Sequence, residues 1–334
     1  MLSTGRIVGW GVVGLGHVVV DALAPGIAAS PGSRLVACAG RDPAKAREIA
    51  ARLGAERTYR DHEELVRDPD IDIDIVYIAT PNALHKEAVV AAAREGKHVL
   101  CEKPLALSVA DAREMERACR EGNVILRVAF QIRLERMLQR AREIIASGQL
   151  GELRSVTFER TASLTQTGKW RQDPQQGGAI FDVATHLLDL VPWLTGLRYR
   201  EVCAFSHPDR RDGKPDDTIA ILARLGDDCH AVIRASREIP YGKNDLVVEG
   251  TRGMLATSAL RWVDEYWLQM KDASGMHEER FTPTPTYRRE VEAMEGELRG
   301  VRSVLPAAED AIYMVEIADA IFKSINTRQT VQVG

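Results

Sequence analysis

The first 125 residues alternate short, β-rich apolar runs with segments of helical periodicity. The runs predicted as strands are residues 6–13, 34–39, 75–79 and 99–102. Helices are predicted from Val18 onward and over residues 43–53, 63–66, 84–94 and 109–119. Strands that alternate with helices are typical of βαβ units, whose parallel sheet is covered by helices on both faces. The pattern therefore predicts a doubly wound α/β domain that binds ligands beyond the carboxyl ends of its strands.

The pattern changes after about residue 125, and a second domain is expected from there. A long helix is predicted over 134–146, another over 180–194 and a last one over 307–324. Short turns join most of the strand-like segments, which are 154–160, 218–224, 229–234, 245–249, 254–257 and 266–270. Short connections favour a mostly antiparallel sheet. We expect domains of 1–125 and 126–334, closely packed, because no linker-like composition separates them.

Composition excludes several classes of function. The chain has 44 Lys and Arg against 48 Asp and Glu, a formal net charge of −4, so its overall charge gives no case for binding nucleic acid or an anionic membrane. No apolar run approaches the roughly 20 residues of a transmembrane helix. No histidine lies at a metal-motif spacing from another histidine or a cysteine, so no metal site is expected. The five scattered cysteines favour a reducing cytoplasm; they are Cys38, Cys101, Cys119, Cys203 and Cys229.

Two glycine patterns compete at the end of the first predicted strand. Gly9-x-Gly11-x-x-Gly14 would place the turn inside the strand, whereas Gly14-Leu15-Gly16-x-x-Val19 follows the strand and opens the helix. Binding a pyrophosphate at a helix N-terminus requires the second arrangement. Val19 in place of a third glycine or alanine weakens this motif, and a plain βα turn is the alternative. Its position in the chain favours dinucleotide binding.

The second predicted strand ends in Ala39-Gly40-Arg41 rather than in an acidic residue. A carboxylate there would bind the ribose hydroxyls of NAD, whereas an arginine suits the 2′-phosphate of NADP. Gly40 leaves room, and Lys45 is near Arg41 on the next helix. We therefore predict a preference for NADP. Asp42 is the competing candidate for NAD, although it could instead cap the helix that begins at Pro43.

Polar residues follow two further strands of the predicted parallel sheet. Cys101-Glu102-Lys103-Pro104 follows one, and Thr80-Pro81-Asn82 follows the strand before it. Both segments would line the edge at which ligands bind. A lysine in a turn is otherwise an ordinary surface residue. His85 begins the next helix, and the alternative to a cofactor role for it is packing or capping.

A third cluster lies on a helix that follows Gly177-Gly178. At 100° per residue, Asp182, His186 and Asp189 fall within about 60° of one another. An apolar stripe adjoins them and anchors the helix; it comprises Val183, Leu187, Leu190, Val191 and Leu194. An Asp and a His four residues apart can contact each other, and imidazole suits the abstraction of an alcohol proton. The alternative is a capping aspartate with a solvated histidine.

Together these motifs resemble the glucose–fructose oxidoreductase, inositol dehydrogenase and rhizopine-catabolism (Gfo/Idh/MocA) family. The most specific element is E-K-P after "GKHVLC", combined with D-x-x-x-H after the Gly-Gly turn. The similar segments span nearly the whole chain: "GRDPAKAREIAARLG", "ATPNALHKEAVVAAAREGKHVLCEKPLALSVADAREM", "GQLGELRSVTF", "GGAIFDVATHLLDLVPWLTG" and "VEGTRGML". The resemblance implies an N-terminal Rossmann domain and a C-terminal α/β domain with a large open sheet. It also implies hydride transfer between NADP or NAD and a sugar, ketosugar or cyclitol.

The resemblance also implies roles for individual residues. Lys103 matches the family lysine that bonds the reacting oxygen, His186 the general acid/base, and Asp182 the residue that orients substrate and histidine. Trp170-Arg171 resembles the Trp-Arg pair of the 1,5-anhydrofructose reductase-like branch, which lies near nicotinamide and substrate. The implied substrate residues are Lys103, Arg133, Trp170, Asp182, His186 and Tyr287. The implied cofactor residues are Gly14, Leu15, Gly16, His17, Gly40, Arg41, Lys45, Thr80, Pro81, Asn82, His85, Glu102, Lys103, Trp170 and Arg171.

Two departures from the family pattern bear on the substrate. The R-F-x-P common after the domain crossover is absent, although Arg133 is kept, and Ala184 replaces the usual glycine between Asp182 and His186. An NAD-dependent glycosidase and a non-catalytic sugar or dinucleotide sensor are the alternative functions on this fold. Retention of Lys103, Asp182 and His186 together favours an enzyme. One face of the second sheet needs a cover, which predicts a homodimer or homotetramer.

Overall fold

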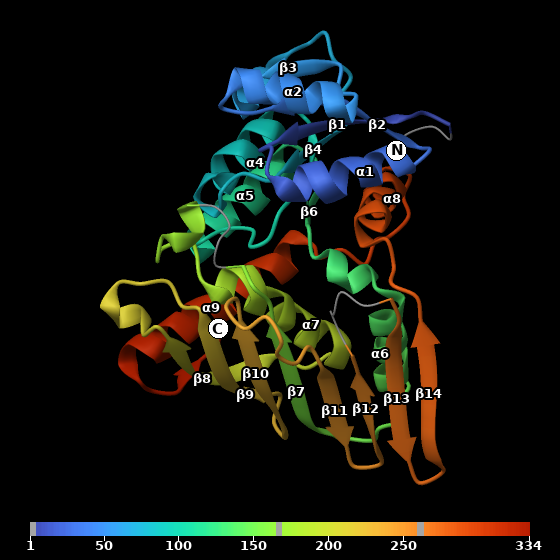
Figure 1. Cartoon of the computed structure of the whole chain (residues 1–334), viewed down its shortest axis with the longest axis vertical. Helices are drawn as coiled ribbons and strands as arrows, with labels where there is room; N and C mark the ends of the chain where they lie inside the picture. The colour runs from blue at the N-terminus through green and yellow to red at the C-terminus, as the bar shows by residue number, and fades with distance from the viewer. Residues whose placement is uncertain (1–4, 165–168, 259–263) are drawn as a thin grey trace. The chain divides into compact units, whose positions relative to one another are not determined.

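A computed structural model of the chain describes residues 5–164, 169–258 and 264–334 (Figure 1). Its contacts divide the chain into two compact units. The first unit comprises residues 1–134 and 285–315, and the second comprises 135–284 and 316–334. The boundary predicted between residues 125 and 126 lies nine residues before this division. The sequence pattern did not predict that residues 285–315 belong to the first unit.

The first unit is built on a six-stranded parallel sheet in the order β3-β2-β1-β4-β5-β6. This is the order of a Rossmann fold, so the predicted doubly wound domain is confirmed. The strands are β1 (Val8–Val13), β2 (Ser33–Ala39), β3 (Arg57–Tyr59), β4 (Ile75–Ile78), β5 (His98–Cys101) and β6 (Leu126–Val128). The short strands β3 and β6 were not predicted.

The first unit contains η1 (Val19–Leu23), α1 (Ala24–Ala29), α2 (Pro43–Leu53), α3 (His62–Arg67), η2 (Asn82–Leu84), α4 (His85–Arg94), α5 (Val109–Glu121), η3 (Gln131–Leu134) and α8 (Thr286–Leu298). The elements from η1 to α5 lie close to the segments predicted as helices. Side-chain caps begin several of them. Asp61 accepts from the amide of Glu64, and Ser108 accepts from that of Asp111. Such caps satisfy backbone donors that the first helical turn leaves unpaired.

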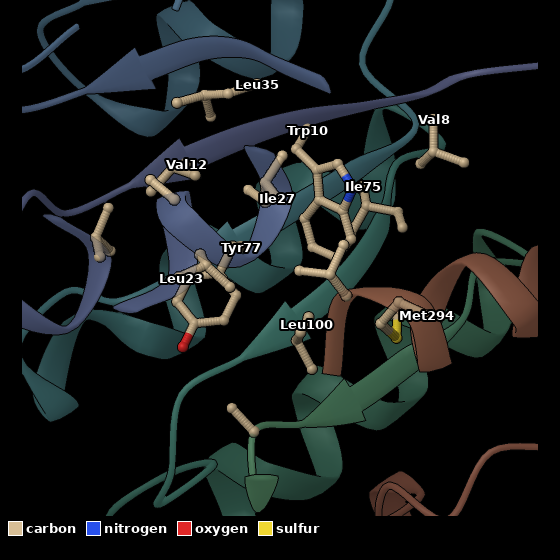
Figure 2. Close-up of a cluster of buried hydrophobic side chains, with 14 of the residues drawn as sticks. Val8, Trp10, Val12, Leu23, Ile27, Leu35, Ile75, Tyr77, Leu100 and Met294 are labelled. Carbon is tan, nitrogen blue, oxygen red and sulfur yellow. The ribbon is translucent and has the colours of Figure 1, made fainter. Parts of the chain in front are cut away.

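The core of the first unit lies between the sheet and its helices. All of β1 is buried, as expected for a parallel strand with both faces covered. Figure 2 shows Trp10 and Tyr77 among aliphatic side chains from neighbouring strands, together with Met294 of α8. The indole nitrogen of Trp10 donates to the hydroxyl of Ser33 at 2.8 Å. The returning helix α8 is therefore part of this core.

The second unit contains a nine-stranded sheet in the order β14-β13-β12-β11-β7-β10-β9-β8-β15 (Figure 1). Only β7 and β10 pair in parallel, so the predicted, mostly antiparallel sheet is confirmed. The strands are β7 (Leu153–Thr161), β8 (Tyr199–His207), β9 (Thr218–Leu225), β10 (Cys229–Ser236), β11 (Leu246–Gly250), β12 (Gly253–Thr257), β13 (Tyr266–Asp272), β14 (Gly275–Phe281) and β15 (Val331–Gln332). Strands β8, β14 and β15 were not predicted.

The helices of the second unit include the one on which the predicted catalytic pair lies. They are α6 (Arg136–Ala146), η4 (Lys169–Gln172), η5 (Ile180–Ala184), α7 (Thr185–Thr195), η6 (Arg210–Asp212) and the later part of α9 (Ala308–Thr327). Every residue from Ile180 to Val191 is buried. A helix buried on all sides is a core element rather than an amphipathic surface helix. In the described part of the chain, no helix is both long and apolar enough to span a membrane.

Candidate active site

The glycine turn after β1 has the geometry that a dinucleotide phosphate needs. Gly14 has a φ of +94°, and a Cβ there would overlap the carbonyl oxygen of Ala79, so glycine is required. At Gly16 a Cβ would meet nothing within 4 Å, and the residue is exposed. The helical segment that begins at Val19 follows directly. The turn therefore leaves its backbone open at the start of a helix, which suits a pyrophosphate.

The other glycine pattern is structural. Gly9 and Gly11 lie within β1, where a Cβ at Gly9 would overlap the carbonyl oxygen of Asp72. Val19, at the third position of the Gly14 pattern, is fully buried in the core of the first unit. It begins a π-helical turn rather than a regular α-helix. The valine at the third position of the motif is thus a core residue at the start of this turn.

The contacts of Asp42, just after β2, distinguish between its two candidate roles, which are binding a ribose and capping a helix. Its carboxylate accepts from the amides of Ala44 and Lys45, at 3.0 and 3.1 Å, and caps α2 directly before Pro43. Arg41 and Lys45 are exposed. A Cβ at Gly40 would lie 3.0 Å from the side chain of Leu15, so glycine lets the two turns approach. The capping role predicted as an alternative for Asp42 is confirmed.

His85 connects the segments that follow β4 and β5. Its Nδ1 lies 2.9 Å from the carbonyl oxygen of Pro104, and its Nε2 lies 3.0 Å from that of Thr80. The ring is fully buried, and burial lowers its pKa. Since both ring nitrogens contact backbone carbonyls, this histidine holds together the two segments that carry Asn82 and Lys103.

The carboxylate of Glu102 is held by its neighbours beside Lys103. It accepts from the hydroxyl of Tyr77 at 2.6 Å and from the backbone amide of Lys103 at 3.1 Å. Glu290 on α8 is completely buried nearby, and its pKa is raised well above the ordinary value by burial and by the charge of Glu102. Tyr77 and Glu290 were not predicted as site residues, because neither belongs to a local motif.

Arg133 and Tyr287, both predicted to reach substrate, lie in the first unit. Arg133 is buried, and its guanidinium lies 3.6 Å from the carboxylate of Asp310. The hydroxyl of Tyr287 accepts from the amide nitrogen of Gln131 at 3.0 Å. Residues 131–134 and α8 are thus joined beside one another, although more than 150 residues separate them in the chain.

The Gly-Gly turn of the second unit allows two segments to approach closely. A Cβ at Gly177 would overlap the carbonyl oxygen of Arg171, and Gly178 has a φ of +113°. The buried carboxylate of Asp216 accepts from the amide of Ile180 at 2.9 Å and is ion-paired with Arg210. These contacts fix the start of the helix that carries Asp182.

Asp182 lies in a π-helical turn, Ile180–Ala184, which continues into α7. The angles calculated at 100° per residue therefore do not hold through this turn. Asp182, His186 and Asp189 are all buried, which excludes the alternative of a solvated histidine. π-Helical turns are frequent at functional sites.

Two arginines contact the carboxylate of Asp182. Nε of Arg171 donates to Oδ1 at 2.9 Å, and a terminal nitrogen of Arg237 lies 3.5 Å from Oδ2. The guanidinium of Arg171 also stacks over the ring of Trp170, 4.7 Å from its centroid. Arg237 was not predicted, and no local pattern could identify it, because its partners lie 20 to 66 residues away.

Comparison with known proteins identifies the family. The sequence model of the oxidoreductase family with an NAD-binding Rossmann fold matches residues 8–130, and that of the Gfo/Idh/MocA C-terminal domain matches residues 138–256. The chain belongs to the Gfo/Idh/MocA family of oxidoreductases. It is therefore an NAD(P)-binding oxidoreductase, and the resemblance found in the sequence is confirmed.

Relatives of this Gfo/Idh/MocA protein act on sugars. It is 30% identical to D-xylose 1-dehydrogenase (NADP(+)) 2 of Haloferax volcanii over 329 residues, which is 97% of this chain and 99% of the relative. It is 26% identical to 1,5-anhydro-D-fructose reductase of Ensifer adhaerens over 330 residues, or 97% and 98%. Levoglucosan dehydrogenase, solved with NADH and levoglucosan, is similar in structure with a TM-score of 0.86 and 25% identity, covering 98% of this chain and 100% of that one.

Proposed function

We propose that this Gfo/Idh/MocA protein interconverts a secondary alcohol and a ketone on a sugar, ketosugar or cyclitol, with NADP preferred over NAD. The buried helix that carries Asp182 and His186 is the observation on which the proposal mainly rests. A buried carboxylate between two arginines is a costly arrangement, and such arrangements are common where a protein performs chemistry. The sugar dehydrogenases and reductases among the relatives support the substrate class.

The residues around the turn at Gly14 and Gly16 suit a dinucleotide. Its exposed backbone and following helix would hold the pyrophosphate, and Arg41 with Lys45 would hold a 2′-phosphate. The role of Asp42 as the cap of α2 supports this preference for NADP, because its carboxylate already has partners within the helix. When bound, the nicotinamide supplies the group that accepts or donates the hydride.

The side chains divide the remaining work. In the direction of oxidation, His186 takes the hydroxyl proton of the substrate. Lys103 stabilises the negative charge that develops on the reacting oxygen, through a charge-assisted hydrogen bond. Asp182 orients the substrate and the histidine, and Trp170, Arg133 and Tyr287 contribute to the substrate pocket. In reduction, His186 returns the proton.

A substrate panel tests this proposal. The purified protein is incubated with aldoses, ketoses and inositols and with each of NADP⁺ and NAD⁺, and reduced nicotinamide is followed by its absorbance. We expect turnover with a subset of these compounds and a lower KM for NADP⁺. Inactivity with every compound in both directions would refute the proposal. Cleavage of an aryl glycoside without net redox change would support a glycosidase instead.

We also propose that a second copy of the chain covers the open face of the nine-stranded sheet. Exposed apolar side chains gather there: Phe205 is 66% exposed, Leu222 55% and Val232 44%. Leu222 and Val232 pair across β9 and β10, and the same row continues through Cys203, Thr157 and Val247. A two-fold axis through this row of side chains would place it against the same row of a second copy.

We propose a cytoplasmic location for the protein, which its free cysteines fit.

A further inference from the structure

Arg237, directly after β10, joins three segments of the second unit that lie far apart in the sequence. Its Nε donates to the carboxylate of Asp217 at 2.7 Å, and a terminal nitrogen donates to the carbonyl oxygen of Arg171 at 2.8 Å. The same terminal nitrogen lies 3.5 Å from Oδ2 of Asp182. The side chain is only 1% exposed, so these contacts are shielded from water.

These contacts form a network in which the positive and negative charges balance. Arg171 binds one carboxylate oxygen of Asp182 and Arg237 lies against the other, while Asp217 provides the second negative charge. Two cations therefore face two anions. A buried charge is tolerated when it is paired, and removal of one partner leaves the others uncompensated.

We propose that Arg237 is a positioning residue of this enzyme: it holds the carboxylate of Asp182 in place and fixes the backbone at Arg171, and with it the Trp170–Arg171 turn. This inference rests on the proposed function, which assigns Asp182 and Trp170 to the substrate. Arg237 acts through these two neighbours and makes no contact of its own with the reacting atoms. Its planar fork is needed because it reaches a carbonyl and two carboxylates at once.

Asp182 has several other charged neighbours on the elements that pack around it. The turn η5 packs against β7, β10 and α7, and Phe181 contacts Phe322 of α9 with ring centroids 5.4 Å apart. These elements also carry Glu159, Arg160, Arg234, His186, Asp189, Glu316, Asp319 and Lys323. Glu159 and Arg234 pair with each other. The ion pairs of Asp182 itself are with Arg171 and Arg237, so these two arginines hold its carboxylate in place.

Substitutions at Arg237 and Asp217 test the positioning role. Arg237→Met removes every contact of the guanidinium, so we expect kcat to fall at least tenfold and the sugar KM to rise. Asp217→Asn keeps an oxygen that can accept from Arg237, so kcat and KM should change much less.

A purely structural arginine would behave differently. It would lower the folded fraction of Arg237→Met while kcat and the sugar KM per folded enzyme stayed at the wild-type values. A kcat per folded enzyme within twofold of the wild type, with an unchanged sugar KM, would overturn the proposal. If Arg237→Met does not fold, Arg237→Lys replaces it: the charge is kept, and kcat should still fall because the fork is lost.

A second readout does not depend on activity. Urea unfolding of Arg237→Met, Asp182→Asn and the double variant forms a double-mutant cycle. We expect the double variant to be less destabilised than the sum of the single variants, because the two side chains interact. Additive effects would overturn the proposed hold on Asp182. If the cycle shows coupling but the wild type transfers no hydride, the proposed function fails and the interaction of Arg237 with Asp182 stands.

Discussion

At the scale of single residues, Glu290 shows how a buried acid makes stability depend on pH. Burial and the charge of Glu102 raise its pKa in the folded protein well above the ordinary value of 4.5. A raised folded pKa means that the protonated acid stabilises the fold below about pH 4.5. This stabilisation is lost as the pH rises toward the folded pKa, by at most about 1.4 kcal/mol for each pH unit.

Glu290→Gln should therefore flatten this part of the pH dependence. Glutamine cannot ionise, so the variant should gain unfolding free energy relative to the wild type between pH 5 and pH 8. Urea unfolding at both pH values measures the difference, and the exposed Glu48→Gln serves as the control. Parallel pH dependences of wild type and Glu290→Gln would contradict the assignment of a protonated acid.

Lys103 is predicted to act on the reacting oxygen. Loss of one oxyanion contact commonly costs about 10²–10³-fold in turnover, so we expect a decrease of that order in kcat for Lys103→Ala. The variant should still bind cofactor, as measured by nicotinamide fluorescence. Lys97→Ala, on the same unit, is the matched control. Near-normal turnover of Lys103→Ala would refute the role of this lysine.

Arg41 is predicted to select NADP. Its removal should weaken NADPH binding by roughly tenfold, since a hydrogen bond to a charged group contributes about 1.5–3 kcal/mol. NADH lacks the 2′-phosphate, so its affinity should be nearly unchanged. Titration of both cofactors against Arg41→Ala, with the exposed Arg47→Ala as control, measures the ratio. An unchanged ratio would count against NADP selection by Arg41.

At the scale of elements, the stability of helix α2 distinguishes between two roles of Asp42, as the cap of this helix and as a ligand of the ribose. Asp42→Ala removes the acceptor of two amides in the first turn and should lower the unfolding free energy by about 1 kcal/mol. Asp42→Asn keeps a capping oxygen and should recover most of this loss. Thermal or urea unfolding of the pair provides the test. A selective loss of NADH affinity in both variants, at constant stability, would instead assign Asp42 to the ribose.

Local patterns predicted most elements of this fold, because they depend on neighbours within a few residues. Periodicity and turn residues gave α2, α5 and both parallel and antiparallel strands close to their observed bounds. Strand β3 is only three residues long, and β14 is polar and largely exposed, so neither carries a strong apolar signal. The π-helical turn at Asp182 was also missed, because 3.6-residue periodicity assumes a regular helix.

The residues of the candidate site differ in the same way. Lys103, Asp182 and His186 were predicted as site residues because each belongs to a short motif, whereas Arg237, Tyr77 and Glu290 lie outside motifs. Arg237 meets Asp182 from 55 residues further along the chain, and a single sequence carries no information on such a contact. Burial, which distinguishes Asp182 and His186 from a solvated pair, likewise emerges only from the assembled second unit.

At the scale of the whole molecule, the apolar row across the open sheet predicts self-association. Leu222 lies at its centre, and an aspartate there would place a charge within the proposed interface, where it could not be solvated. Leu222→Asp should therefore lower the mass measured by light scattering from that of an oligomer to that of one chain, while the secondary structure stays unchanged. Val301→Asp, an equally exposed apolar position on the first unit, is the control and should leave the assembly intact. A wild-type protein that is monomeric at micromolar concentration, or a Leu222→Asp variant with unchanged mass, would contradict this interface.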